Sequence, residues 1–413
     1  MTDYLKVSGS VFVRNEQQIL LKSVGLGNWL NLEHFMLGIP GTESQIRGLI
    51  SRRYGAAASQ KFWQRYYEQS VSQKDVAYIA SQGLNSIRVP INHNLFSDAT
   101  SFEQSTAVKQ IDRILPWCKA AGLLVILDMH SAPLGQNPDW HSDNDTADYG
   151  FWKNEAAQRQ LVALWKQIAA YYKDDPVIGG YDLLNEPCYL DTSLDDVMLR
   201  FYGDAIAAIR SVDASHVIFV EGNTYARDFS MFTENMDDNL SYSFHFYPFL
   251  QAGGMDVQRE DAKARLRDML HRDVTYAHLK DTLRKPLWCG ETGHPHHSPD
   301  KRYILETFLT LLEEDGVSWA MWPYKDAGEM GMVTLAADCP WNRRMGELSG
   351  GWRFFDFFTQ DSFVTINGES DRMNYYRRMA DFSTKGFNTF AKNLNGVDFE
   401  ELMSLLDSWS VLS

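Results

Sequence analysis

Eight short apolar runs, separated by longer stretches of mixed character, constrain the fold of this chain most. They cover residues 21–26, 85–90, 123–129, 181–186, 217–222, 242–247, 287–292 and 317–323. Near-continuous apolar runs of this length are typical of parallel strands that are buried on both faces. A strand followed by a helix, repeated eight times, predicts an α/β fold of the (β/α)8 TIM-barrel type. A doubly wound sheet is the alternative, but VGLGNW after the first run does not match the G-x-G-x-x-G pattern.

Helical periodicity fills several of the intervals between the apolar runs. The helical stretches are 70–82, 107–122, 155–175, 195–213 and 302–316, and another at 373–394 follows the eighth run. Pro116 falls inside the second stretch, so we expect a kink or a split there.

The two ends of the chain carry additions to the barrel. Residues 1–20 resemble a β-hairpin that turns at Arg14–Gln17 and could plug the bottom of the barrel. Residues 331–370 are rich in glycine and aromatic residues and predict a long loop region, and 396–413 predict a short amphipathic helix. No linker divides the chain. We therefore expect one domain over 1–413, with the hairpin at 1–20, the barrel core at 21–330, and the loop region and C-terminal helices at 331–413.

Charge and hydropathy exclude several classes of partner. The chain has 39 Lys and Arg against 54 Asp and Glu, a net charge of −15. This charge repels nucleic acid and anionic lipid, so neither nucleic acid nor membrane is expected as a partner, and the substrate is expected to be uncharged. The N-terminus lacks the basic and apolar regions of a signal peptide. We expect a cytoplasmic protein, or a secreted or periplasmic one whose signal has been removed. The sequence leaves the oligomeric state open.

Cysteines and clustered histidines give no metal pattern. The four cysteines are far apart and form no C-x-x-C pair, which argues against a zinc site and a dense disulfide framework. Cys118 and Cys289 lie in apolar stretches and are expected to be buried, while one disulfide stays possible. His294, His296 and His297 have a spacing that fits no helix-borne ligand pair. We therefore expect no metal and no cofactor.

Polar or aromatic residues stand at the end of almost every apolar run, where a TIM barrel has its active site. Buried singly, each ionisable group would cost several kcal/mol, whereas clustered in one mouth they satisfy one another and bind a polar ligand. They are Asn28, Glu33, Arg88, Asp128, His130, Asn185, Glu186, Glu221, Asn223, His245, Tyr247, Glu291 and Trp322.

Two of these residues are carboxylates that suit one reaction. Glu186 in LLNEP and Glu291 in WCGETG end the fourth and seventh runs, which face each other across a barrel. Hydrolysis of a glycosidic bond needs one carboxylic acid at the leaving oxygen and one carboxylate at the anomeric carbon. A separation of about 5–5.5 Å gives retention of configuration. Because Glu291 places a like charge beside it, Glu186 is expected to have a raised pKa.

Seven ordered motifs over residues 8–330 resemble glycoside hydrolase family 5, a family of retaining (β/α)8 glycosidases. The motifs are LGNWLNLE, SIRVPI, LDMHSAPLGQN, LLNEP, FHFYPF, CGETG and WAMWPYKD, and the first and third are nearest to the exo-β-1,3-glucanase-like branch. The chain departs from that branch at Gly27–Asn28, where a double glycine is usual, and at Leu134, which interrupts a Pro–Gly pair. The exact glycan and its linkage therefore stay undetermined.

The resemblance implies a role for each motif residue. Glu186 is the acid/base and Glu291 the nucleophile, which Arg88 and Tyr247 position and keep ionised. His130 and His245 contact the sugar or the acid/base, Asn185 the 2-hydroxyl, and Trp322 forms the floor of the first subsite. Purely structural roles remain as alternatives: Arg88 in a salt bridge to Asp128, the two histidines as structural groups, and Trp322 in the core. Glu221 is expected to be supporting.

The substrate end of the site is less determined. The loop after the third run carries Trp140, His141, Asp143 and Asn144, a composition typical of sugar binding, and Trp140 and Asp143 are expected to contact substrate. By the resemblance, Glu33 binds the terminal non-reducing sugar, which predicts exo-action on a neutral glucan or glucoside.

Several other functions stay open. They are an endo-β-glucanase or mannanase of the same family, a glycosidase acting on furanosides, and a non-catalytic carbohydrate-binding barrel. An aldolase or isomerase on this fold would need a Schiff-base lysine or a metal cluster at the strand ends, and the sequence shows neither.

Overall fold

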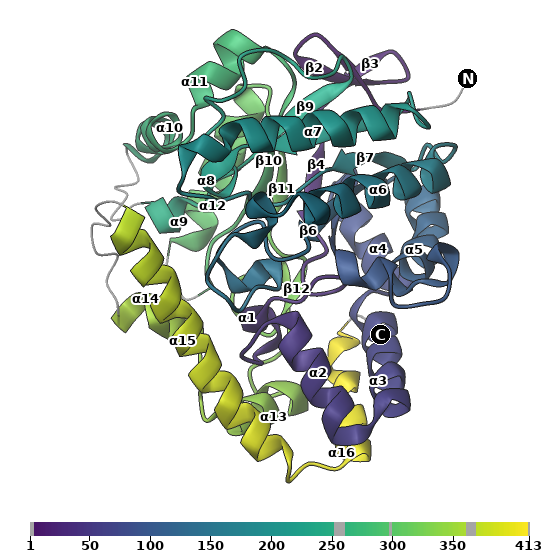
Figure 1. Cartoon of the computed structure of the whole chain (residues 1–413), viewed down its shortest axis with the longest axis vertical. Coiled ribbons are helices and arrows are strands. Elements are labelled where there is room, and N and C mark those ends of the chain that lie inside the picture. The colour runs from purple at the N-terminus through teal and green to yellow at the C-terminus, as the bar shows by residue number, and fades with distance from the viewer. Residues whose placement is uncertain (1–3, 252–260, 297–299, 361–368, 412–413) are drawn as a thin grey trace.

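The structure is a computed structural model, and it describes residues 4–251, 261–296, 300–360 and 369–411. Eight parallel strands close into a barrel, confirming the predicted TIM barrel (Figure 1). In barrel order they are β4 (Lys22–Gly25), β5 (Ser86–Asn92), β6 (Leu124–Ser131), β7 (Ile178–Asp182), β8 (Val217–Glu221), β9 (Leu240–His245), β10 (Leu287–Thr292) and β11 (Ser318–Met321). Every residue of β5, β6, β9 and β10 is buried, which explains their continuous apolar runs.

Helices surround the barrel between successive strands. The predicted ones are α4 (Gln73–Ser81), α5 (Thr106–Ala121), α6 (Glu155–Tyr172), α7 (Asp195–Arg210) and α12 (Lys301–Glu314). Helix α5 contains Pro116 without being split in two. Helices that were not predicted are α1 (His34–Leu37), α2 (Glu43–Tyr54), α3 (Ala56–Ser70), α8 (Asn223–Ala226), α9 (Pro248–Gln251), α10 (Ala262–Asp273) and α11 (Tyr276–His278).

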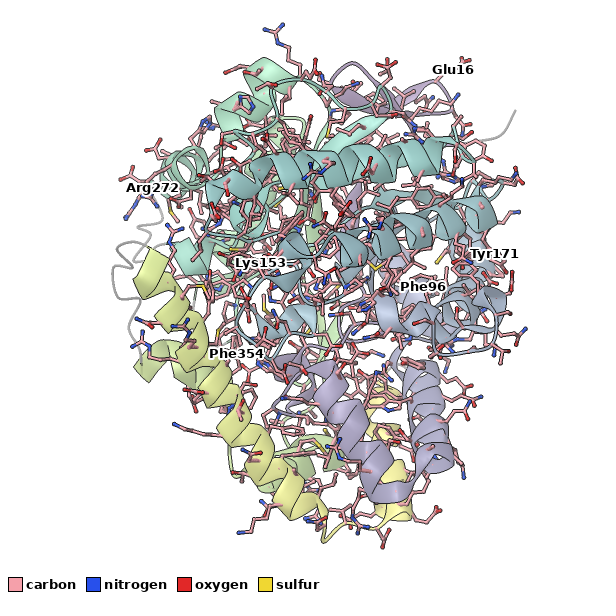
Figure 2. All side chains as sticks on the ribbon, in the orientation of Figure 1. Glu16, Phe96, Lys153, Tyr171, Arg272 and Phe354 are labelled. Carbon is pink, nitrogen blue, oxygen red and sulfur yellow. The ribbon has the colours of Figure 1, made fainter. Side chains whose placement is uncertain are left out.

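The N-terminal segment closes the bottom of the barrel, as predicted. Strands β1 (Lys6–Ser8), β2 (Val11–Arg14) and β3 (Gln17–Ile19) form an antiparallel sheet, one strand larger than the expected hairpin. Asn15 and Glu16, the latter labelled in Figure 2, make the tight turn between β2 and β3 with φ of 50° and 64°. Phe12 packs on Phe219 with ring centroids 5.8 Å apart, and Trp288 belongs to the same apolar cluster.

The C-terminal region holds more helix than the sequence analysis expected. Within 331–370, α13 (Pro340–Ser349), α14 (Phe355–Gln360) and the short strand β13 (Val333–Thr334) replace the predicted loop. Strand β13 pairs with β12 (Lys325–Asp326), which precedes this region. Helix α13 has a proline at its start and Gly350 in the left-handed conformation at its end, and both are sequence signals of a helix. Residues 361–368 lie outside the described part.

Two long-range features complete the fold. Helices α15 (Glu369–Leu394) and α16 (Phe399–Leu405) match the predicted C-terminal helices, and α16 lies at the end of the long axis opposite the N-terminal sheet (Figure 1). The four cysteines are free thiols, and Cys118 and Cys289 are buried as expected. Among the described residues, no helix combines the length and hydropathy needed to cross a membrane.

Candidate active site

A cavity of about 420 Å³ opens at the carboxyl ends of the barrel strands. This volume lies in the range of small-ligand pockets. Eight residues predicted from the sequence line it: Glu33, His130, Trp140, Glu186, His245, Tyr247, Glu291 and Trp322. The strand-end residues therefore do converge in one mouth.

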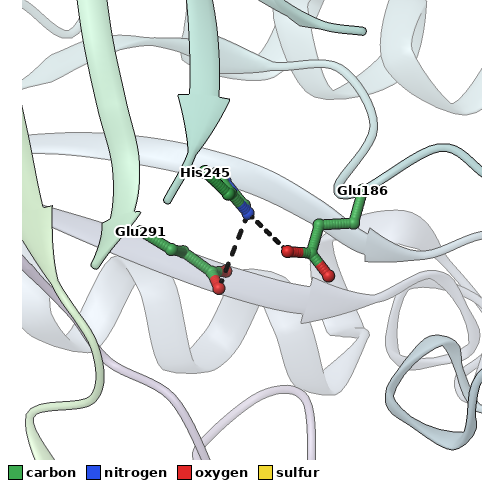
Figure 3. A group of neighbouring side chains, drawn as sticks. All are labelled: Glu186, His245 and Glu291. Atoms are coloured by element: carbon green, nitrogen blue, oxygen red, sulfur yellow. Dashed lines mark hydrogen bonds and ion pairs between the residues drawn. The ribbon is translucent and has the colours of Figure 1, made fainter. Parts of the chain in front are cut away.

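The two carboxylates lie close together across the cavity. Glu291 belongs to β10, whereas Glu186 stands four residues beyond Asp182, the last residue of β7. A Glu186 oxygen, a Glu291 oxygen and a His245 nitrogen all lie within 4.8 Å of one another (Figure 3). An inverting enzyme would need about 6.5–9.5 Å to fit a water, so this separation indicates the retaining mechanism.

Glu186 is held in an uncommon backbone conformation. Its φ is 47°, in the left-handed region that non-glycine residues rarely adopt. Its backbone N–H donates to Glu221 Oε2 at 2.6 Å, and Asn137 donates to its carbonyl at 2.9 Å. These two bonds fix the direction of the Glu186 side chain, which supports a functional reason for the strain.

Both oxygens of Glu291 accept hydrogen bonds. Arg88 Nη1 lies 2.5 Å from Oε1, and the Tyr247 hydroxyl donates to Oε2 at 2.7 Å. These contacts fix the orientation of the carboxylate, as a nucleophile requires.

Arg88 lies beneath the cavity and does not line it. Its guanidinium is fully buried and meets four carboxylates, with Asp128 at 3.2 Å, Asp182 at 3.0 Å, Glu221 at 3.1 Å and Glu291 at 2.5 Å. Both predicted roles of Arg88, at Glu291 and at Asp128, therefore coexist. Burial raises the pKa of Asp182 to about 6, against the lowering effect of Arg88. Burial also raises the pKa of Glu221 to about 7, against the lowering effects of His245 and Arg88.

Asn185 is the other predicted residue beneath the cavity floor. Its side-chain oxygen accepts a hydrogen bond from Arg88 Nη2 at 2.8 Å. Its amide nitrogen lies 3.4 Å from His130 Nε2. Contact with a sugar 2-hydroxyl stays a prediction.

The prediction of a raised pKa for Glu186 was wrong. Burial would raise it, but hydrogen bonds from His141 and His245 hold the Glu186 pKa well below its usual value. His141 Nε2 lies 3.1 Å from Glu186 Oε2, and His245 Nδ1 lies 2.8 Å from Oε1. His141 was noted in the loop sequence but not as a partner of the acid/base.

Replacing His141 by glutamine is expected to move the alkaline limb of the kcat/KM pH profile to lower pH. Burial lowers the His141 pKa, but its hydrogen bond to Glu186 and the charges of Asp139 and Glu186 raise it to about 9. Up to that pH the His141–Glu186 pair retains the proton that the leaving group needs. Glutamine still donates a hydrogen bond but carries no titrating proton. Glu186 then keeps His245 alone of its two histidine partners, and we expect the catalytic proton to be lost below pH 9.

The measurement is kcat/KM against pH on a substrate with a poor leaving group. His271, which is exposed, supplies the control variant His271→Gln. An alkaline limb that is the same in His141→Gln and in the unmodified enzyme would show that the pair does not share the catalytic proton.

Glu33, His130 and Trp322 form one wall of the cavity. Glu33 Oε1 lies 3.1 Å from His130 Nε2, and His130 Nδ1 lies 2.7 Å from Asp128. Trp322 stacks on His130 with ring centroids 5.3 Å apart and planes 8° apart. A Cβ atom at Gly25 would lie 2.5 Å from the Trp322 ring, which explains the need for this glycine beneath the wall.

Trp140 and Asp143 differ in placement although both stand in the predicted sugar-binding loop. Trp140 lines the cavity, stacked on His34 at 3.4 Å and packed on Phe354, which Figure 2 labels. Asp143 lies outside the lining, and its carboxylate accepts hydrogen bonds from the Ser44 backbone at 2.7 Å and from Asn92 at 3.0 Å. Asp143 supports the loop, and its expected contact with substrate stays a prediction.

The donor atoms that could hold a metal ion among the described residues are those of Glu186, His245 and Glu291. They are the two carboxylates and the histidine between them, and retaining hydrolysis by two carboxylates requires no metal. In the histidine segment, His296 Nε2 lies 3.0 Å from the Gly331 carbonyl and His294 packs against Phe249. His297 lies outside the described residues.

A (β/α)8 barrel with two carboxylates this close at its mouth defines a retaining glycoside hydrolase. The chain belongs to glycoside hydrolase family 5: the family model described as "Cellulase (glycosyl hydrolase family 5)" matches residues 40–328. The family predicted from the motifs is thereby confirmed.

Individual relatives carry several activities in their names. A beta-xylosidase of Phanerodontia chrysosporium is 34% identical over 358 residues, covering 82% of this chain and 74% of its own. Endoglucanase C of Acetivibrio thermocellus is 26% identical over 309 residues, covering 64% and 87%. The structure of beta-glucanase SdGluc5_26A from Saccharophagus degradans, solved with cellotetraose, matches with a TM-score of 0.53 at 17% identity, over 92% and 93%. The expected exo-β-1,3-glucanase-like branch is not confirmed.

Proposed function

We propose that this protein is an exo-acting retaining β-glycosidase that releases one terminal neutral sugar from a β-linked substrate. The carrying observation is Glu33, a carboxylate only 6% exposed, which lines the cavity beside His130. Glucosides and xylosides are the first substrates to test, because the 34% identical relative is named a beta-xylosidase.

The reaction follows from the positions of the two carboxylates. Glu291 attacks the anomeric carbon while the proton of the His141–Glu186 pair passes through Glu186 to the leaving oxygen. A glycosyl ester on Glu291 forms and the leaving group departs as an alcohol. Glu186 then removes a proton from water, which attacks the same carbon and releases the sugar with its original configuration.

Exo-action follows from the chemistry of a buried carboxylate. Burial raises the pKa of Glu33, against the lowering effect of its hydrogen bond with His130. A terminal sugar hydroxyl that donates to Glu33 would contribute roughly 1.5–3 kcal/mol. A chain that continued past this sugar would replace the donating hydroxyl, so the buried carboxylate would lose that hydrogen bond and be crowded by the added sugar.

The early product pattern on long soluble β-glucans and xylans tests this function. We expect a single monosaccharide with little fall in viscosity, and a panel of 4-nitrophenyl β-glycosides identifies the sugar. Glu33→Ala is expected to lower kcat/KM on the preferred nitrophenyl glycoside about 10- to 100-fold, the loss of one charge-assisted hydrogen bond. A rapid fall in viscosity with a ladder of oligosaccharides would instead indicate an open cleft and endo-action.

A further inference from the structure

The acid/base defines where the leaving group must lie. Because Glu186 protonates the leaving oxygen, the departing part of the substrate occupies the cavity next to Glu186 and away from Glu291. On that side His141 contacts Glu186, and the ring of Tyr225 lies 6.1 Å from the His141 ring. Tyr225 is thus separated from the acid/base by one side chain only.

Aromatic side chains continue from Tyr225 along α15. Tyr376 lies 6.2 Å from Tyr225, and Tyr375 lies 5.8 Å from Tyr376, between ring centroids. Met379, one turn further along α15, also lines the cavity. These four residues all face the same cavity as the two carboxylates, although α15 begins almost two hundred residues after Glu186 in the sequence.

The hydroxyl groups of the two central tyrosines are directed into the protein. The Tyr225 hydroxyl oxygen is buried from solvent, and the Tyr376 hydroxyl lies 3.9 Å from the thiol of buried Cys188. Burial raises the pKa of both phenols well above the usual value. The rings therefore present carbon, and not hydroxyl, to the cavity.

Tyr225 is held there by strained backbone. Thr224, Tyr225 and Ala226 have φ of 59°, 57° and 57°, three consecutive non-glycine residues in the left-handed region. This conformation is disfavoured for a bulky aromatic residue and persists where surrounding contacts determine it. The Tyr225 N–H donates to the Pro187 carbonyl at 3.0 Å, which ties the turn to the segment that follows Glu186.

Two charged groups on this side, Asp139 and Arg227, are each bonded through one atom to neighbouring backbone, and the other Asp139 oxygen lies 3.7 Å from His141. Asp139 accepts a hydrogen bond from the Trp140 N–H at 2.8 Å, and Arg227 Nε donates to the Thr224 carbonyl at 2.9 Å. A second sugar in this position would need several hydrogen-bond partners for its hydroxyls, whereas an apolar group needs only matching carbon surface.

We propose that Tyr225, Tyr376 and Met379 form a leaving-group subsite that accepts an apolar aglycone, aryl or alkyl, in place of a second sugar, which rests on the proposed function of removing a terminal sugar. The natural substrates in this assignment are β-glycosides of apolar alcohols or phenols. The glycone occupies the polar end of the cavity at Glu33 and His130, and the aglycone lies between the Tyr225 turn and α15.

The test compares four substrates with one glycone: the glycosyl fluoride, the phenyl glycoside, the octyl glycoside and the disaccharide. The fluoride is the reference, because its single-atom leaving group does not reach the subsite. In the unmodified enzyme we expect kcat/KM for the octyl glycoside to exceed that for the disaccharide at least about 10-fold. The loss that the Tyr225 variant causes for octyl, compared with its loss for phenyl, identifies the alkyl or aryl preference, because each ratio cancels the intrinsic difference in leaving-group reactivity.

Two variants of Tyr225 distinguish the contribution of its ring from the contribution of its hydroxyl group. Tyr225→Asn introduces a polar side chain that tolerates the left-handed conformation. It should lower kcat/KM for phenyl and octyl glycosides about 10- to 30-fold, as truncation of a buried aromatic contact does, with the fluoride unchanged. Tyr225→Phe should stay within about twofold on every substrate, as should the exposed-site control Tyr171→Ala.

Any other result would contradict a specific part of the proposal. If the disaccharide is preferred, or if Tyr225→Phe impairs the disaccharide selectively, the subsite binds a sugar. If Tyr225→Asn impairs fluoride and octyl glycoside equally, Tyr225 supports the catalytic residues and forms no aglycone subsite. If the enzyme hydrolyses a glycosyl fluoride but shows no preference for apolar leaving groups, this inference alone is overturned. If it hydrolyses none of the glycosyl fluorides, whatever their sugar, the proposed function is overturned and the inference with it.

Discussion

Replacing Glu291 by alanine is expected to lower kcat on the order of 10⁵- to 10⁶-fold, the size of the loss when a covalent nucleophile is removed. Glu291 is the carboxylate that both Arg88 and Tyr247 contact, and it faces Glu186 across the cavity. The neighbouring carboxylate, Glu186, is assigned to the leaving group and so does not replace Glu291. The measurement is kcat on the best nitrophenyl glycoside, with the fold checked by circular dichroism.

Azide distinguishes loss of the nucleophile from general damage. In Glu291→Ala the space of the carboxylate admits azide, which attacks the anomeric carbon directly and gives the α-glycosyl azide from a β-glycoside, with inverted configuration. Near-normal activity in Glu291→Ala, or an azide product of retained configuration, would exclude Glu291 as the nucleophile.

The variant is also expected to fold. Arg88 is shared by four buried carboxylates, so removal of one leaves three to balance its charge and relieves repulsion among them. The melting temperature of Glu291→Ala should therefore equal or exceed that of the unmodified enzyme. This is the usual relation where a site is built for activity and not for stability.

The barrel was predictable because strands that are buried on both faces have continuous apolar sequences. The fourth strand of the barrel, β7, is an exception. The run at 181–186 was predicted as a strand, but β7 covers Ile178–Asp182, and two glycines inside it make its sequence look unlike a strand. Leu183 and Leu184 are buried beyond the strand, so apolar character alone extended the predicted strand to Glu186, four residues past its observed end at Asp182.

The site was predictable only as far as each residue belongs to a strand end. His141 follows β6 in the chain, Tyr225 stands in the short helix α8, and Tyr376 stands on α15 far along the chain. No local pattern therefore places them beside Glu186. Asp182, the last residue of β7, also contacts Arg88, but it belongs to no sequence motif that would mark it as part of the site. The pKa of Glu186 was mispredicted for the same reason: the sequence pairs it with Glu291, whereas the fold adds His141.

Replacing Glu186 by alanine is expected to separate substrates by their leaving groups. For alkyl glycosides, whose leaving oxygen must be protonated, kcat/KM should fall about 10²- to 10⁴-fold. For the 2,4-dinitrophenyl glycoside, whose anion leaves without a proton, kcat/KM should change little. Its kcat should still fall, because loss of the base slows hydrolysis of the ester on Glu291, and a burst of dinitrophenol should appear.

Azide again supplies the stereochemical check. In Glu186→Ala it attacks the glycosyl ester in place of water and gives the β-glycosyl azide, with retained configuration, opposite to the product from Glu291→Ala. Equal losses on alkyl and dinitrophenyl glycosides would contradict the acid/base role of Glu186.

His141 makes this prediction sharper. It lies 3.1 Å from Glu186, and in the unmodified enzyme its raised pKa keeps it protonated at neutral pH. If His141 delivered its proton to the leaving oxygen directly, Glu186→Ala would retain most of its activity on alkyl glycosides. We expect Glu186→Ala to lose this activity, because removal of the Glu186 charge lowers the His141 pKa and so deprotonates His141 more readily. Adding His141→Gln to Glu186→Ala should therefore cause no further loss, whereas His141→Gln alone shifts the alkaline limb of the pH profile.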